Sequence, residues 1–183
     1  MAFRVKIESW GRYLQGPHEV SKPAFLADAH AILRGCDRNA LAFGAGRSYG
    51  DVCLNRDGML ICTAGLNRMI EADWTTGVIC AEAGLTLDSL LQIAVPKGWF
   101  LPATPGTKFV TLGGAIANDV HGKNHETAGT IGCYVRRIGL AQSSGEVLEL
   151  SESNNAELFQ ATIGGLGLTG LILRFRQPTR MSL

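Results

Sequence analysis

Apolar residues recur with helical spacing in several segments of the chain. In residues 22–34 (KPAFLADAHAILR) they fall on one helical face, and the run ends at a glycine. Residues 86–95 (TLDSLLQIAV) begin with a threonine, whose hydroxyl can cap a helix N-terminus. The small apolar residues of 110–118 (VTLGGAIAN) suit a short helix packed closely against a sheet or a ligand. A further short helix is predicted over residues 156–162 (AELFQAT).

Short apolar runs between these segments predict strands, and two of the runs flank Ser144-Gly145, a dipeptide typical of a hairpin turn. Strands outnumber helices and the two types follow no regular alternation, which favours an α+β fold over a doubly wound sheet. We expect two lobes, over about residues 1–75 and 76–183, with the boundary near 73–77. The predicted strands cover residues 39–43, 59–63, 69–72, 77–83, 135–143, 146–150 and 168–177.

The charge balance narrows the range of partners. Lys and Arg number 17 and Asp and Glu 16, a formal net charge of +1 without long runs of one sign. We therefore predict no nucleic-acid partner. No apolar stretch has the length of a transmembrane segment, and the N-terminus lacks the apolar core of a signal peptide. The five cysteines form no CxxC pair, which favours a reducing, cytoplasmic compartment over a disulfide framework or a structural zinc site.

Glycine is unusually frequent, at 23 residues, and it is concentrated in four places: 44–50, 106–114, 129–132 and 164–170. Glycine lets a backbone approach a ligand because no Cβ stands between them. Any one cluster alone is explained by a tight turn. Four clusters in one chain of this size predict a large ligand that is contacted at several points.

The first cluster lies in residues 43–51 (FGAGRSYGD), directly after a predicted strand. Its GxGxxxG spacing differs from the GxGxxG of a dinucleotide-binding Rossmann turn, and the following residues form a poor helix. No GxxxxGK[ST] phosphate loop occurs in the chain. Successive backbone N–H groups can nevertheless form an anion-binding nest, to which Arg47 and Ser48 would add donors.

Residues 105–129 (PGTKFVTLGGAIANDVHGKNHETAG) join small residues to a polar group that includes Asn118, His121 and Lys123. The small residues allow a flat ligand to lie against the backbone, and the imidazole adds a titratable group. His121 and His125 have the i, i+4 spacing of a metal pair, but Gly122 weakens a helix there and no third ligand stands at a recognised spacing. We predict no metal site. Paired hydrolytic carboxylates and a GxSxG nucleophile turn are also absent from the sequence.

Three segments together resemble the FAD-binding domain of the vanillyl-alcohol oxidase superfamily, which has the PCMH-type fold. They are GAGRSYGD (44–51), PGTKFVTLGGAIANDVHGKNH (105–125) and ELFQATIGGLGLTGLI (157–172), and HGKNH after TLGGAIA is the most specific element. The likeness is greatest to the sugar- and aldonolactone-oxidising branch, which includes the decaprenylphosphoryl-β-D-ribose oxidases. It implies a two-lobed α+β domain that grips an extended FAD between its lobes and accepts hydride from a sugar or polyol hydroxyl.

The resemblance also implies roles for individual residues. Tyr49, His121 and Lys123 would lie at the flavin end as catalytic residues. The substrate would be a small-molecule or lipid-linked sugar, and a lipid-linked ribose would place the protein at the periphery of the inner membrane. The residues implied to bind FAD are Ala42, Phe43, Gly44, Ala45, Gly46, Arg47, Ser48, Tyr49, Gly50, Asp51, Val52, Gly106, Thr111, Leu112, Gly113, Gly114, Asn118, Asp119, Val120, His121 and Ile172.

The chain departs from the family pattern in two ways. Many relatives tether the flavin through a histidine at the position of Arg47, and an arginine cannot form that bond, so we expect non-covalent FAD. Relatives also continue into a substrate domain, so we expect this chain to be a fragment that binds FAD with little turnover. The alternatives are a non-catalytic nucleotide-binding or scaffold module that retains the fold, and a metal-dependent enzyme built on Asp119, His121 and His125.

Overall fold

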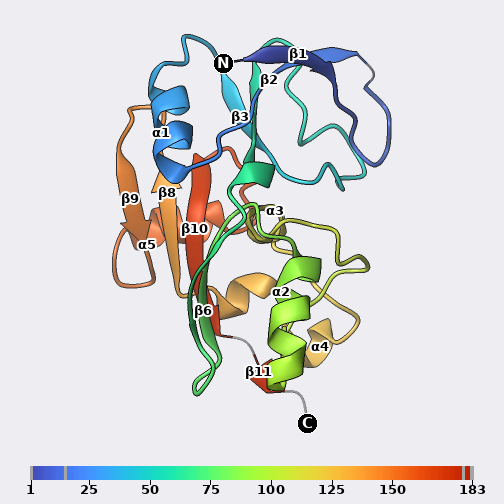
Figure 1. Ribbon diagram of the computed structural model, residues 1–183, viewed down its shortest axis with the longest axis vertical. Helices are drawn as coiled ribbons and strands as arrows, with labels where there is room; N and C mark the ends of the chain where they lie inside the picture. The colour runs from blue at the N-terminus through green and yellow to red at the C-terminus, as the bar shows by residue number, and fades with distance from the viewer. Residues whose placement is uncertain (1, 15, 179, 182–183) are drawn as a thin grey trace.

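Two β-sheets form the framework of the computed structural model, which describes residues 2–14, 16–178 and 180–181 (Figure 1). The first sheet contains β1 (Phe3–Lys6), β2 (Pro17–Ser21), β4 (Met59–Cys62) and β3 (Ala40–Phe43), in that spatial order. The second contains β5 (Met69–Asp73), β6 (Val78–Glu82), β10 (Leu171–Pro178), β8 (Arg137–Ala141) and β9 (Val147–Leu150), again in spatial order. A separate two-stranded pair contains β7 (Trp99–Phe100) and β11 (Arg180–Met181).

The two sheets differ in strand direction. In the first, β1 and β2 are antiparallel, whereas β2 and β3 each run parallel to β4. In the second, every neighbouring pair is antiparallel, and β8 and β9 form the hairpin predicted around Ser144-Gly145. Mixed sheets with separate helices confirm the predicted α+β class.

Helices α2 (Leu87–Ala94) and α3 (Leu112–Ala117) begin where a threonine hydroxyl accepts a hydrogen bond from a free N-terminal N–H group. The Thr86 hydroxyl accepts a hydrogen bond from the Ser89 N–H (3.1 Å) at the start of α2, and the Thr111 hydroxyl accepts one from the Gly114 N–H (3.2 Å) at the start of α3. The first helix starts at Leu26 rather than at residue 22, because the Asp28 carboxylate accepts the Phe25 N–H (3.1 Å) and fixes the helix start there. The α-helices are α1 (Leu26–Arg34), α2 (Leu87–Ala94), α3 (Leu112–Ala117), α4 (His125–Ala128) and α5 (Ala156–Thr162).

Other boundaries also differ from the prediction. Strand β5 pairs with β6 in the second sheet, so the chain passes between the sheets at residues 63–68 rather than at 73–77. Residues 73–77 are instead a hairpin turn, in which the Asp73 carboxylate accepts the Thr75 N–H (2.9 Å). Strand β10 begins at Leu171 rather than at 168, because Gly170 adopts a φ of 146°. Strands β1, β2, β7 and β11 and helix α4 were not predicted.

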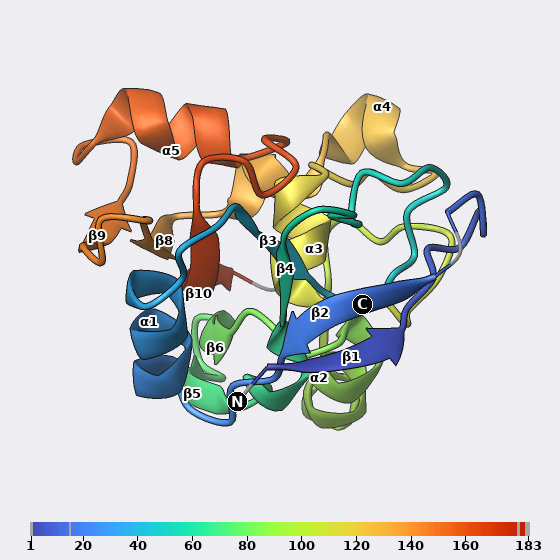
Figure 2. The same ribbon diagram turned by 90° about the horizontal axis from the view of Figure 1, so that it is seen from above.

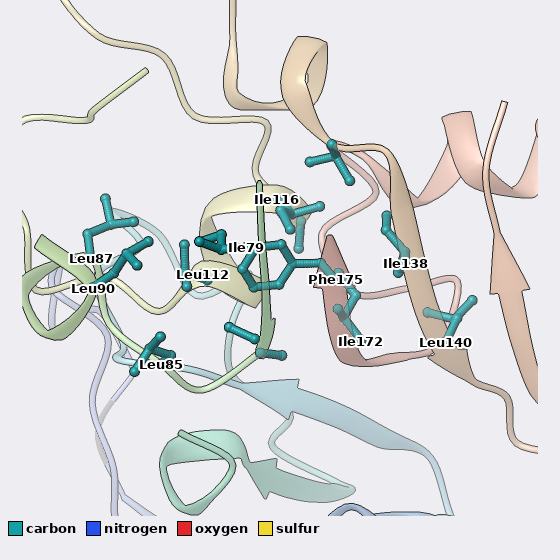
Figure 3. Packing of buried hydrophobic residues seen from close by; sticks show 14 of the residues in the cluster. Ile79, Leu85, Leu87, Leu90, Leu112, Ile116, Ile138, Leu140, Ile172 and Phe175 are labelled. Atoms are coloured by element: carbon teal, nitrogen blue, oxygen red, sulfur yellow. The ribbon is translucent and has the colours of Figure 1, made fainter. Parts of the chain in front are cut away.

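The largest core cluster lies between the second sheet and helices α2 and α3. Figure 3 shows side chains from these elements meeting around Phe175, which is only 1% exposed. Truncation of such a buried ring to alanine costs about 3–5 kcal/mol of folding free energy. This core therefore fixes α3 firmly against β10.

A second core cluster joins the two sheets. It combines Ala29 and Leu33 of α1, Ile61 of β4, and Leu171 and Leu173 of β10. The His30 imidazole and the Gly145 carbonyl, in the β8–β9 turn, are also in hydrogen-bonding contact. The sheets are thus packed as one body, with α3 near the middle of the molecule in both views (Figures 1 and 2). Among the described residues, no helix has the length and apolar character needed to cross a membrane.

Candidate functional site

A cavity of about 630 Å³ opens where the two sheets meet. Its walls come from the loop after β3, from the segment that leads into α3 and α3 itself, and from residues 166–172 before and within β10. A volume of this size is typical of a site for a cofactor-sized ligand. Three segments that are far apart in the sequence therefore line one space.

Most of the predicted cofactor-binding residues line this cavity. They are Ala42, Gly44, Ala45, Gly46, Arg47, Ser48, Tyr49, Val52, Gly106, Thr111, Gly113, Gly114, Asn118, Val120, His121 and Ile172. Of the remaining predicted cofactor-binding residues, Phe43 and Leu112 are buried in the core clusters, and Gly50, Asp51 and Asp119 lie outside the cavity lining.

The loop after β3 presents unused hydrogen-bond donors to the cavity. Gly46 has a φ of 64°, a left-handed conformation that glycine adopts without strain. Among the described residues, none accepts a hydrogen bond from the Ala45, Gly46 or Arg47 N–H groups. Consecutive free N–H groups are the donor set of an anion-binding nest. Burial raises the pKa of the Cys53 thiol, which also lines the cavity, so that side chain stays neutral at physiological pH.

Helix α3 forms the facing wall, and its N-terminal donors are already used within the protein. The Leu112 N–H donates to the Leu85 carbonyl (2.8 Å) and the Gly113 N–H to the Ala83 carbonyl (2.7 Å). The Gly114 N–H is taken by the Thr111 hydroxyl. This wall therefore offers a flat surface of small residues rather than hydrogen bonds. The small residues that line the cavity here are Gly113, Gly114, Ala115 and Ala117 of α3 and the neighbouring Ala83.

Residues 164–170 form the third wall and also close the C-terminus of α3. The Gly164 N–H donates to the Ile116 carbonyl (3.0 Å), and the Leu166 N–H donates to the Ala117 carbonyl (2.8 Å). Both N–H groups come from the glycine cluster of residues 164–170, one of the four clusters predicted to contact a large ligand. The segment thus both supports α3 and lines the cavity.

Asp119 has a structural role that the motif did not indicate. Its φ is 43°, and its carboxylate accepts the Gly132 N–H at 2.9 Å. The side chain is therefore directed to residue 132, which explains why Asp119 does not line the cavity. Because the Asp119 carboxylate is directed to residue 132, it does not form a metal-binding group with His121 and His125.

The predicted catalytic residues are only partly brought together. Tyr49, which is 85% exposed, and His121 both line the cavity, whereas Lys123 is exposed outside it. The rings of His121 and His125 lie 5.2 Å apart, centroid to centroid. Within the described part of the chain, no three His, Cys, Asp or Glu side chains are grouped so as to hold a metal ion.

Comparison with known proteins shows the family. The family model described as "FAD binding domain" matches residues 17–151. The chain belongs to this family of FAD-binding domains. It is 41% identical over 177 residues to decaprenylphosphoryl-beta-D-ribose oxidase of Mycolicibacterium smegmatis, an alignment that covers 92% of this chain and 38% of the relative.

Other relatives of this FAD-binding domain act, by name, on different hydroxy compounds. L-gulonolactone oxidase of Bos taurus is 31% identical over 175 residues, covering 92% of the chain and 39% of the relative. D-lactate dehydrogenase of Anaerostipes hadrus is 29% identical over 166 residues, covering 85% and 35%. The chain thus spans less than two fifths of the length of these relatives.

The cavity fits two parts of FAD, the diphosphate and the flat ring system. Free N–H groups on the loop after β3 fit an anionic diphosphate, and the small residues along α3 leave room for a flat ring system. The cavity lining also includes residues that were not predicted individually. Pro105, Thr107, Val110, Ala115, Ala117, Leu166, Gly167 and Gly170 lie within the segments that carry the resemblance. Trp10, Cys53, Thr63 and Ala83 lie outside those segments, and the fold brings them to the cavity from separate elements.

Proposed function

We propose that this chain is the FAD-binding half of an oxidoreductase that oxidises a hydroxyl group of a sugar or polyol. The observation that carries the proposal is the cavity, in which free N–H donors face a wall of small residues. Bound FAD supplies the hydride acceptor, a capacity that no amino-acid side chain provides. The protein supplies binding, orientation and exclusion of water.

The loop after β3 and helix α3 bind different parts of the cofactor. The N–H groups of Ala45, Gly46 and Arg47 hold the diphosphate, and the backbone and methyl groups of α3 lie against the planar part of the cofactor. Ile172, in the third wall, contacts the adenine end. The dinucleotide is held without a covalent bond, because Arg47 stands where many relatives carry the tethering histidine.

Both His121 and Tyr49 line the cavity, and they are the residues that we expect to meet a substrate hydroxyl. The His121 imidazole is the candidate general base for the hydroxyl proton. Lys123 follows two residues later and contributes its charge from outside the cavity lining. A partner domain, as in the longer relatives, covers this end and selects the substrate.

The substrate class follows from the relatives. The enzymes named above carry ribose- and gulonolactone-oxidising activities in their names, so a sugar-like hydroxyl compound fits best. A lipid-linked ribose is the finer proposal. It would place a cytoplasmic protein at the periphery of the inner membrane.

Titration of the purified chain with FAD tests the proposal. We expect FAD to bind with a perturbed flavin absorption spectrum and to bind more tightly than ADP, because α3 contributes contacts to the flavin half. A non-catalytic nucleotide-binding module would instead bind ADP as tightly as FAD. No binding of either ligand would contradict both readings of the cavity.

A further inference from the structure

Trp10 lies in the wall of the cavity, although no motif of the sequence marked it. It precedes residues 17–151, the part of the chain that the family model matches. Its side chain is 59% exposed, so core packing does not account for its position. The cavity lining therefore extends N-terminal to residues 17–151.

Close backbone contacts hold the segment around Trp10 against the loop after β3. A Cβ at Gly11 would collide with the Tyr49 carbonyl oxygen, and a Cβ at Gly46 would lie 2.9 Å from the Glu8 carbonyl oxygen. Glycine is required at positions 11 and 46 because the N-terminal segment and the loop after β3 are in backbone contact at both places. The contacts fix Trp10 opposite Arg47.

The Arg47 guanidinium lies over the Trp10 ring, with 5.6 Å between its Cζ atom and the ring centroid. This distance is within the range of a cation–π contact. No carboxylate in the described residues lies within ion-pair distance of Arg47. Glu8, close to Trp10 in the chain, is paired with Lys6 (2.8 Å) and Arg12 (3.9 Å) instead.

Arg47 therefore brings to the cavity a positive charge that no protein anion neutralises. We propose that Trp10 is a positioning residue that holds the Arg47 guanidinium in the cavity wall, where it pairs with the phosphate charge of the bound dinucleotide. This inference rests on the proposed function. Guanidinium–phosphate pairing is a strong charge-assisted interaction. It offers this chain a means of retaining FAD where relatives rely on a covalent bond.

The test compares FAD, ADP and riboflavin binding to the wild-type chain and to variants at both positions. In Arg47→Gln we expect an FAD dissociation constant about tenfold higher, with ADP weakened equally. Riboflavin, which lacks phosphate, should bind the variant and the wild-type chain alike. Trp10→Leu should weaken FAD by about three- to fivefold, whereas Trp10→Phe retains the ring face and stays near wild type.

Two further measurements separate a positioning role from a general structural one. In Arg47→Gln, the Trp10→Leu change should have little additional effect, and the salt dependence of FAD binding should be shallower than in wild type. Tyr13→Leu is the matched control, because Tyr13 is 79% exposed and lies outside the cavity lining.

The outcomes distinguish this inference from the proposed function. If the wild-type chain binds no FAD, the proposed function fails and this inference fails with it. If the wild-type chain binds FAD but the Arg47 and Trp10 variants bind it equally well, only this inference is overturned. If the variants lost as much affinity for riboflavin as for FAD, the inference would also be overturned, because Arg47 and Trp10 would then act on the flavin ring system rather than on the phosphates. The melting temperatures of the variants are compared with that of the wild-type chain, and unchanged values show that the variants are folded.

Discussion

The two glycine-rich walls of the cavity look alike in sequence but differ in what their backbones contact. At the start of α3, the N–H groups of Leu112, Gly113 and Gly114 all donate within the protein. In the loop after β3, the N–H groups of Ala45 and Gly46 have no acceptor among the described residues. Glycine in α3 therefore serves packing of the chain on itself, whereas the loop keeps its donors for a ligand.

The difference teaches how a glycine cluster should be interpreted. A Cβ at Gly113 would lie 2.7 Å from the Ala83 Cβ, whereas a Cβ at Gly106 would have no protein atom within 4 Å. Both glycines line the cavity. Substitution of the first should thus disturb folding, and substitution of the second should disturb ligand binding alone.

The largest effect is expected at Gly113. In Gly113→Val the new side chain would press on Ala83, so the free energy of unfolding should fall by about 3 kcal/mol in urea denaturation. Gly50→Val is the control, because Gly50 is exposed and its Cβ would meet no protein atom within 4 Å. Equal stability of the two variants would show that α3 does not depend on this close approach.

Gly44 is the point at which the two walls touch, since its Cβ would collide with the Thr111 hydroxyl that caps α3. Gly44→Ala should cost about 1–2 kcal/mol of stability through displacement of this cap, and Thr111→Ala about 1 kcal/mol. The double variant should lose less stability than the sum of the two single losses, because Gly44→Ala already displaces the Thr111 cap that Thr111→Ala would remove. Additive losses in a thermal or urea denaturation cycle would contradict the contact.

Gly106 offers the opposite test. Gly106→Ala should leave the free energy of unfolding within about 0.5 kcal/mol of wild type and raise the FAD dissociation constant several-fold. Gly50→Ala, also open but outside the cavity lining, should change neither quantity. Fluorescence titration with FAD distinguishes the two variants, and equal affinities would remove Gly106 from the site.

The smallest effect is expected at Asp73, in the β5–β6 turn outside both walls. Hydrogen bonds from Thr76 and Thr75 lower the pKa of the Asp73 carboxyl. Its folded pKa lies below its unfolded pKa, so the stabilisation is complete above the unfolded value and is lost as the pH falls through the folded value. Thr76→Ala should raise this pKa towards its ordinary value in a ¹³C NMR titration and leave FAD affinity unchanged. A pKa unaffected by the substitution would contradict the assigned cause.

The sequence was sufficient for most elements and for the segments that form the site. Local signals located α2, α5 and the β8–β9 hairpin, because a capping threonine and a Ser-Gly turn act within a few residues. The pairing of β5 with the second sheet and of β2 with β4 depends on contacts distant in the chain, and no local pattern indicated them. The hydrogen bond between the Asp119 carboxylate and the Gly132 N–H was not predicted for the same reason, since the fold brings these two residues together.

Trp10 shows the same limit within the site. A lone exposed aromatic residue near the N-terminus carries no sequence signal, and only the packing of Gly11 on Tyr49 brings it opposite Arg47. Motifs drew attention to the loop after β3, but they did not reveal which of its N–H groups lack a partner in the protein. That distinction required the hydrogen bonds of the folded chain.

The central claim is that this cavity holds FAD through non-covalent contacts. Acid precipitation of the FAD-loaded chain, followed by measurement of flavin absorbance in the supernatant and in the redissolved pellet, tests it most directly. The account predicts that all of the bound flavin appears in the supernatant. Flavin that remains with the precipitated protein would contradict it, as would a chain that carries no flavin after incubation with FAD.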